Sequence, residues 1–214
     1  MYRFVVTTAA CALAATASAD LYTDAAGDIV TGNPNLDIVS AEITNDDLNL
    51  FVSIVVADLD ADWGKYVMMI DVDGDGGDSS NPWGRSVNTP NGIDGFMGSW
   101  IDGGGGGLSY SYDGSGWNSG ADPSVSVDFA NNTISYEISL AGLGLSLGDT
   151  FVFDIGSTGG SNGDPLIDTM GADVQPGWGN GSNSNMDLTY TVVPAPGALA
   201  LLGLAALAGR RRRN

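Results

Sequence analysis

Apolar and polar side chains alternate in short runs between residues 20 and 193, and no run of useful length follows the period of a helix. In the run LNLFVSIVV, every second residue from Leu48 to Val56 is apolar. Strict alternation is the pattern of a strand with one face buried. The preceding run, IVSAEIT, is expected to pair with this strand through a turn at Asn45-Asp46-Asp47.

Further segments repeat this pattern. The stretch VSVDFANNTISYEISL predicts a hairpin at Asn131-Asn132, with the apolar positions from Val125 to Phe129 on one strand and those from Ile134 to Leu140 on the next. LSYSYDGSGW predicts another hairpin at Asp113-Gly114, and FVFDI and MDLTYTV predict two more strands. About eight to ten short strands with Gly, Asn and Asp turns predict an all-β fold, a single antiparallel β-sandwich of the jelly-roll type.

Glycine is concentrated in two segments, GDGGDSSNPWG and DGGGGG, which both lie between residues 74 and 107. Long loops in a compact domain are usually functional or disordered. We therefore expect residues 74 to 107 to form glycine-rich loops at an edge of the sandwich that faces a ligand or an ion.

Charge is segregated along the chain. The 26 acids all lie between Asp20 and Asp187, where Lys65 and Arg85 are the two bases, and the other bases are Arg3 and the run 210–213. Phosphate binding needs clustered Lys and Arg, so the composition excludes a nucleic-acid partner. The acids favour a divalent-cation partner or, alternatively, contribute solubility alone.

The N-terminus has the three parts of a secretory signal. Arg3 precedes an apolar stretch from Phe4 to Ala15, and Ala17-Ser18-Ala19 is a cleavage site before Asp20. Residues 1–19 are therefore predicted to be a signal peptide, followed by a sandwich domain over residues 20–191. Cleavage would remove Cys11 and leave a chain without cysteine.

Residues 192–214 have an ordered pattern of their own. Pro194-Ala195-Pro196 comes before an apolar stretch from Gly197 to Gly209, and four arginines follow at 210–213. This order resembles a PEP-CTERM sorting signal, with Ala195 where the motif has Glu. The resemblance implies a short apolar helix that anchors the chain transiently in the membrane and an exosortase-type processing enzyme. It also implies a cell-surface or extracellular location in bacteria that make extracellular polysaccharide. The alternative is a permanent tail anchor.

The body also resembles a known group. DAAGDIV, LDIVSAEIT, YVMMIDVDGDG, NPWGR and EISLAGLGLSLGDTFVFDI follow one another in the order seen in family 9 carbohydrate-binding-module-like domains, which are β-sandwiches related to the DOMON group. The resemblance implies binding of a sugar or a surface ligand, often with a structural Ca²⁺. An early aspartate pair can join the calcium site of this family, which implies such a role for Asp24 and Asp28.

The motif DVDGDG is the strongest calcium candidate in the sequence itself. It places Asp71, Asp73 and Asp75 in a tight glycine turn, and Asp78 could complete an oxygen cage for Ca²⁺. An EF-hand is excluded because its twelfth position is Pro82, where a bidentate Glu is required, and no flanking helices are evident. The alternative is an exposed acidic turn at the end of a strand.

Sugar binding usually needs an aromatic platform with polar groups at its edge. Trp83 in NPWGR and Trp178 in PGWGNG lie in loop-like segments, and the rare base Arg85 could bond a ligand hydroxyl or an acidic sugar. Alternatively, each tryptophan plugs an end of the sandwich beneath a loop, which we prefer for Trp63, Trp100 and Trp117.

Catalysis is disfavoured by what the composition lacks. Without histidine or a mature cysteine, Ser-His-Asp and Cys-His arrangements and the usual zinc sites cannot form. The two glutamates, Glu42 and Glu137, lie inside expected strands. We therefore expect a non-enzymatic, exported and surface-sorted sandwich that binds carbohydrate or acts in the extracellular polysaccharide matrix. The alternative is a structural or adhesive calcium-binding protein without a sugar ligand.

Overall fold

The structure is a computed structural model that describes residues 19–59, 63–72, 77–171 and 174–195. The expected signal peptide, the apolar stretch and arginine run of the tail, and the candidate ligands Asp73 and Asp75 lie outside the described residues. Within the described ranges, no helix is long and apolar enough to cross a membrane.

One sheet has five antiparallel strands in the order β1-β2-β3-β10-β9. These strands are β1 (Asp20–Thr23), β2 (Ile38–Asn45), β3 (Asn49–Val56), β9 (Ser124–Asp128) and β10 (Thr133–Ser139). The turn between β2 and β3 forms where it was expected, because Asp46 Oδ1 accepts hydrogen bonds from the backbone N–H groups of Leu48 and Asn49. The expected hairpin between β9 and β10 is also confirmed.

The second sheet has seven antiparallel strands, six of them in the order β12-β11-β4-β6-β7-β8. Strand β14 pairs with the first part of β11, and β12 pairs with the last part. The strands are β4 (Lys65–Asp71), β6 (Gly95–Trp100), β7 (Gly106–Tyr112), β8 (Trp117–Ser119), β11 (Thr150–Thr158), β12 (Leu166–Thr169) and β14 (Leu188–Thr191).

Short elements complete the described part of the chain. Strands β5 (Val87–Asn88) and β13 (Ser182–Asn183) form a small parallel pair, in contrast to the antiparallel main sheets. Three 3₁₀ helices are η1 (Pro34–Leu36), η2 (Asp102–Gly104) and η3 (Ala141–Leu143).

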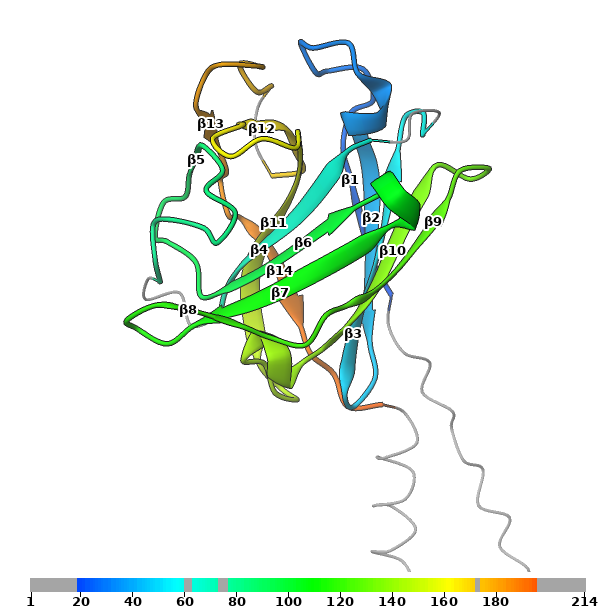
Figure 1. The fold of residues 1–214 in the computed structure, drawn as a ribbon. Coiled ribbons are helices and arrows are strands. Elements are labelled where there is room, and N and C mark those ends of the chain that lie inside the picture. Colours follow the sequence, from blue (N-terminus) through cyan, green and yellow to red (C-terminus); the bar gives the residue numbers. More distant parts are fainter. Residues whose placement is uncertain (1–18, 60–62, 73–76, 172–173, 196–214) are drawn as a thin grey trace, which may run out of the picture.

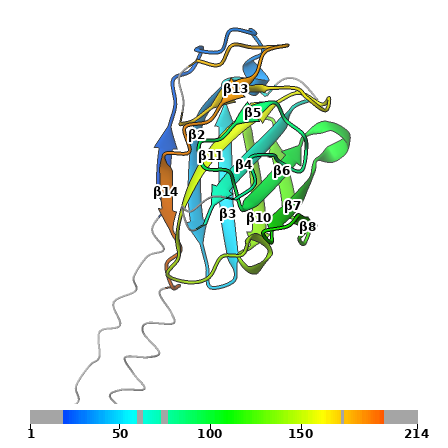
Figure 2. The ribbon, with the colours of Figure 1, turned by 90° about the vertical axis from the view of Figure 1, so that its left-hand side faces the viewer.

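The two large sheets lie face to face, and the strands of one run obliquely to those of the other (Figures 1 and 2). The core between them takes alternate residues from both sheets, such as Ile54 and Ile138 from one and Met68, Ile70 and Phe153 from the other, all at most 2% exposed. Alternation thus buries one face of each strand, as the sequence predicts. The expected all-β fold is confirmed as a β-sandwich-like arrangement of antiparallel sheets.

Some details of the expected pattern are wrong. Leu48 and Phe129 are 72% and 51% exposed, because each lies in a turn just outside the strand to which its alternation assigned it. The described residues also hold more strands than the about eight to ten expected, since pairs as short as β5 and β13 carry no periodic signal.

The largest correction concerns residues 74–107. This stretch was expected to form loops, yet it contains β6, which lies between β4 and β7 in the middle of the second sheet. The glycine inside this strand has a packing role, because a Cβ on Gly98 would lie 2.3 Å from Cη2 of Trp83. The glycine therefore admits a tryptophan ring against the outer face of the sheet.

A second apolar cluster lies on that outer face. Its buried members are Val67, Met69, Ile93, Phe96 and Leu166. The segments around β5 and β13 lie over the seven-stranded sheet on the side away from the core (Figure 1). This cluster fixes the loop that carries Trp83, since the Trp83 ring meets Phe96 edge-on at 5.6 Å between centroids.

Two buried tyrosines give a matched test of the core. Tyr66 donates a hydrogen bond to the Asn35 carbonyl, whereas the buried Tyr136 hydroxyl has no partner in the described residues. Tyr66→Phe should lower the free energy of unfolding by about 1–2 kcal/mol, and Tyr136→Phe should leave it unchanged or raise it. Urea denaturation of both variants measures the difference. An equal loss in both would show that the Tyr136 hydroxyl is satisfied in solution.

Candidate calcium and ligand sites

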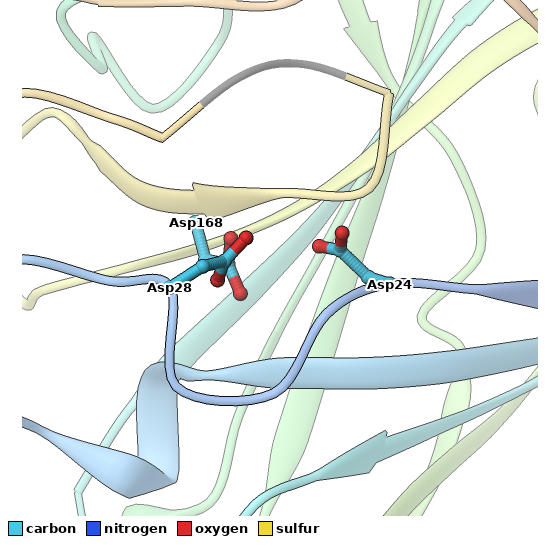
Figure 3. A group of neighbouring side chains, drawn as sticks. All are labelled: Asp24, Asp28 and Asp168. Atoms are coloured by element: carbon cyan, nitrogen blue, oxygen red, sulfur yellow. The ribbon is translucent and has the colours of Figure 1, made fainter.

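Aspartates from two distant parts of the chain meet at one end of the sandwich. Asp24 follows β1, Asp28 lies further along the same loop, and Asp168 is on β12. One carboxylate oxygen of each lies within 4.8 Å of those of the other two. Figure 3 shows the three carboxylates turned toward a shared space between the loop and β12. The predicted pair Asp24 and Asp28 is thus brought together, and Asp168 joins it.

A fourth aspartate borders this group. Asp37, next to η1, is 4% exposed, and its Oδ2 accepts a hydrogen bond of 2.7 Å from the N–H of Gly27, between Asp24 and Asp28. Asp168 is held to the sandwich by the N–H groups of Ile38 (2.6 Å) and Thr169 (2.9 Å). We call Asp24, Asp28, Asp37 and Asp168 the aspartate cluster.

Three oxygens of the aspartate cluster are buried and have no hydrogen-bond partner among the described residues. They are Asp24 Oδ2, Asp28 Oδ1 and Asp37 Oδ1. Buried polar atoms are nearly always paired, because an unpaired one loses its hydration without compensation. Here the three unpaired atoms are all carboxylate oxygens, which are the ligand atoms that a bound hard cation would use.

Burial and repulsion by neighbouring acids raise the pKa values of Asp24, Asp37 and Asp168. Burial raises the pKa of Asp168 to about 8, with smaller contributions from Asp24 and Asp28. It also raises the pKa of Asp24 to about 6 and that of Asp37 above its usual range, and Asp28 adds to both effects. A cation in the cluster would reverse this cost, since its charge favours the ionised carboxylates.

The chemistry of the aspartate cluster fits a hard cation. It offers only oxygen ligands, and carboxylates in an irregular loop suit Ca²⁺, which accepts six to eight oxygens in flexible geometry, about 2.3–2.6 Å from the ion. The four carboxylates of the cluster supply such ligands, and three of them have a buried oxygen without a hydrogen-bond partner among the described residues.

The DVDGDG candidate is placed only at its two ends. Asp71 is buried at the end of β4. Both oxygens of Asp78 accept protein hydrogen bonds, from Ser80 N and Oγ and from Trp117 Nε1, and these bonds lower the pKa of Asp78. Asp78 therefore fixes the loop to Trp117. The described residues leave the remainder of this candidate a prediction.

Trp83 and Arg85 line a pocket of about 540 Å³ on the outer face of the seven-stranded sheet. Trp100 and Lys65, which are cross-strand partners on β6 and β4, line it too. The rings of Trp83 and Trp100 lie 6.3 Å apart at a tilt of 40°, and the Arg85 guanidinium lies 5.4 Å from the Trp83 ring centre. We call this the tryptophan pocket.

Trp178 is not among the residues that line the tryptophan pocket. Its side chain is 43% exposed and packs against Gly159, where a Cβ would stand 2.9 Å from Trp178 Cζ3. The structure thus brings together two of the three predicted ligand-binding residues. Trp100, for which we preferred a buried role, is half-buried and lines the pocket.

The two glutamates, Glu42 and Glu137, are exposed on the outer face of the five-stranded sheet, where both line a shallow depression of about 310 Å³. Their place on strands β2 and β10 is as expected. The expectation that the chain is not an enzyme stays a prediction.

In comparison with known proteins, no family model matches the chain, and no curated protein sequence matches it. The resemblances to PEP-CTERM tails and to family 9 carbohydrate-binding-module-like domains therefore stay predictions.

The raised pKa values give a pH dependence with a defined sign. Asp154, a buried acid of β11 outside the cluster, behaves like Asp24 and Asp168. In the unfolded chain these three aspartates lose their protons near pH 3.8, whereas the folded domain holds them until about pH 6 at Asp24 and Asp154 and about pH 8 at Asp168. The folded state binds more protons over this interval, so its stability falls as the pH rises. Melting in EDTA should show a midpoint that decreases from pH 5 to pH 8.5.

The variant to compare with the wild-type protein is Asp168→Asn, because it removes the acid with the highest of these pKa values and keeps one carbonyl oxygen. It should show a smaller decrease over the same pH range. A midpoint that rises with pH in EDTA would contradict the raised pKa values of Asp24 and Asp168.

Proposed function

We propose that this protein is an exported, non-catalytic β-sandwich that binds Ca²⁺ in the aspartate cluster. The observation that supports this most strongly is the set of three buried, unpartnered carboxylate oxygens on Asp24, Asp28 and Asp37, beside the fourth carboxylate of Asp168. Repulsion among these acids leaves the loop that follows β1 less stable without a cation. Bound Ca²⁺ would join that loop to β12 and, through Asp168, to the start of β2.

The expected destination fits this role. The N-terminal signal and the tail pattern favour export and surface sorting by an exosortase-type enzyme, with extracellular polysaccharide as the surrounding partner. Calcium sites of extracellular modules bind in the range of about 10⁻⁴–10⁻³ M. A cluster of this kind would therefore be filled outside a cell and serve as a structural support there.

Carbohydrate binding is the second candidate function, and the tryptophan pocket favours it. Two indole rings, an arginine and asparagine side chains converge on one cavity of about 540 Å³. Ligand pockets of about 300–1,000 Å³ with aromatic walls and a few polar groups are typical of small-molecule sites. The two functions are compatible, because the cluster and the pocket are formed by different residues.

A non-catalytic role is supported by the residues that the chain offers for acid–base chemistry. The chain has no histidine, and its two glutamates, Glu42 and Glu137, are exposed on β2 and β10. The carboxylates of Asp24, Asp28 and Asp168 face one another across the space between the loop and β12 (Figure 3). The arrangement therefore suits ion binding better than proton transfer to a substrate.

Calcium should stabilise the protein through Asp28. Binding to the native state alone adds about 2.7 kcal/mol at a hundredfold excess over Kd. At about 2–4 °C per kcal/mol, this should raise the melting temperature by roughly 5–10 °C between EDTA and saturating Ca²⁺ at pH 7.5. Asp28→Asn should abolish most of this rise, because it removes a carboxylate ligand of the ion. The substitution breaks no hydrogen bond described for that side chain.

The control is Asp122→Asn, which makes the same charge change at an exposed site outside the cluster. This variant should keep the full calcium response. Asp73→Ala tests the DVDGDG turn: loss of the response in that variant, with an intact response in Asp28→Asn, would move the calcium site to the turn.

A side chain placed in the tryptophan pocket should block carbohydrate binding without harming the fold. Gly160 lines the pocket, its φ is not in the left-handed range, and a Cβ there would have one neighbour within 4 Å, Lys65 Cε at 4.0 Å. Gly160→Gln should abolish binding on a glycan array and leave the melting temperature unchanged. Gly116→Gln, where a Cβ would meet nothing within 4 Å, is the matched control. Equal binding by both variants would place the sugar site elsewhere.

A further inference from the structure

Both cationic side chains of the acidic body line the tryptophan pocket. Lys65 and Arg85 are the bases that accompany 26 acids between Asp20 and Asp187, and both line this one cavity. They come from different elements, since Lys65 begins β4 and Arg85 lies in the loop before β5. In the part of the chain that the structure describes, no acidic residue lines the cavity.

Arg85 is held in place and keeps an unused donor. It is 8% exposed, stacks on Trp83 and donates from Nη1 to the Ser161 carbonyl, while its buried Nε has no partner among the described residues. Asp164, the acid that acts on it electrostatically, lies outside the pocket wall. A guanidinium fixed in this way is pre-organised to bind an anion.

Lys65 has a partner that a ligand can replace. Its Nζ pairs with Asp102 of η2, but the Asp102 side chain is 52% exposed, whereas that of Lys65 is 18% exposed. Exposed ion pairs contribute little to stability. An anion inside the pocket would meet Lys65 in drier surroundings than Asp102 does, where the attraction between opposite charges is stronger.

We propose that the tryptophan pocket binds a sugar residue that carries a carboxylate. The proposal rests on the carbohydrate-binding candidate above and names its ligand class. Trp83 and Trp100 supply apolar surface for a sugar ring, and Lys65 and Arg85 bind the carboxylate. The acidic body repels a dense polyanion, so an isolated uronic-acid residue among neutral sugars fits better than a continuous acidic chain.

Matched glycosides test the carboxylate directly. Methyl glucuronide and methyl glucoside differ only at C6, as do methyl galacturonide and methyl galactoside. Each is titrated into the isotope-labelled protein in saturating Ca²⁺ and followed by NMR. One of the uronides should bind at least about tenfold more tightly than its neutral partner, as charge-assisted hydrogen bonds are the stronger kind.

Two variants with opposite expectations separate recognition from structure. Lys65→Met should weaken uronide binding about tenfold and leave neutral glycoside binding unchanged. Asp102→Asn breaks the same ion pair but frees Lys65, so uronide affinity should stay the same or rise. Equal losses in both variants would show that the pair only orders the loop, and would overturn the proposal.

The outcomes also distinguish the carboxylate preference from the carbohydrate binding on which it rests. If neutral glycosides bind as tightly as uronides and Lys65→Met changes neither, the pocket is a sugar site without a carboxylate preference. If none of the four glycosides perturbs the pocket, both the carboxylate preference and the carbohydrate candidate are wrong.

Discussion

Twenty-six carboxylates share two cationic side chains between Asp20 and Asp187, so the fold has to accommodate most of these acids without ion pairs. In the turns, it does so with backbone N–H groups. Asp46, Asp113 and Asp128 each accept hydrogen bonds from the N–H groups two and three residues further along. A short acidic side chain thereby replaces a missing backbone partner and fixes the hairpin at the same time.

The same constraint is harder to meet where acids are buried. Asp154 is fully buried, yet its carboxylate accepts three hydrogen bonds, from Ile155 N, Gly171 N and Ser184 Oγ. The aspartate cluster places four carboxylates together, and three of their buried oxygens have no hydrogen-bond donor among the described residues. Asp154 thus has its acceptors paired with protein donors, whereas the cluster has the unpaired oxygens for which we propose a bound cation.

How much the sequence predicts depends on how local each signal is. The hairpins at Asn45-Asp46-Asp47 and Asn131-Asn132 are found because alternation and turn residues are adjacent in the chain. Strand β6 is missed because its glycine reads as a loop signal, and its real role is contact with Trp83 across the sheet face. Strand pairing brings residues far apart in sequence together, and no local pattern reports it.

The candidate sites follow the same division. Asp24 and Asp28 are only four positions apart and can be proposed from sequence, whereas Asp168 reaches them only because its carboxylate binds the N–H of Ile38, 130 positions away. Lys65 had a usable signal, since it is as rare in the body as Arg85. The sequence could not show that Lys65 and Arg85 line the same pocket. This depends on the pairing of Lys65 with Trp100 and on the packing of the Trp83 loop over Gly98.

The acid surplus also shapes how the tryptophan pocket can recognise a ligand. At a distance, the negative body repels anions, but the Debye length is only about 8 Å at physiological ionic strength, so this repulsion fades beyond the immediate surface. Inside the pocket, the local groups decide, and these are two cations with partly buried surroundings and no acidic wall in the described residues. Long-range repulsion and short-range attraction together favour a ligand whose negative charge is single and well placed. In a domain with so many acids, the place of Lys65 and Arg85 in the fold therefore says more about the ligand than the count of basic residues does.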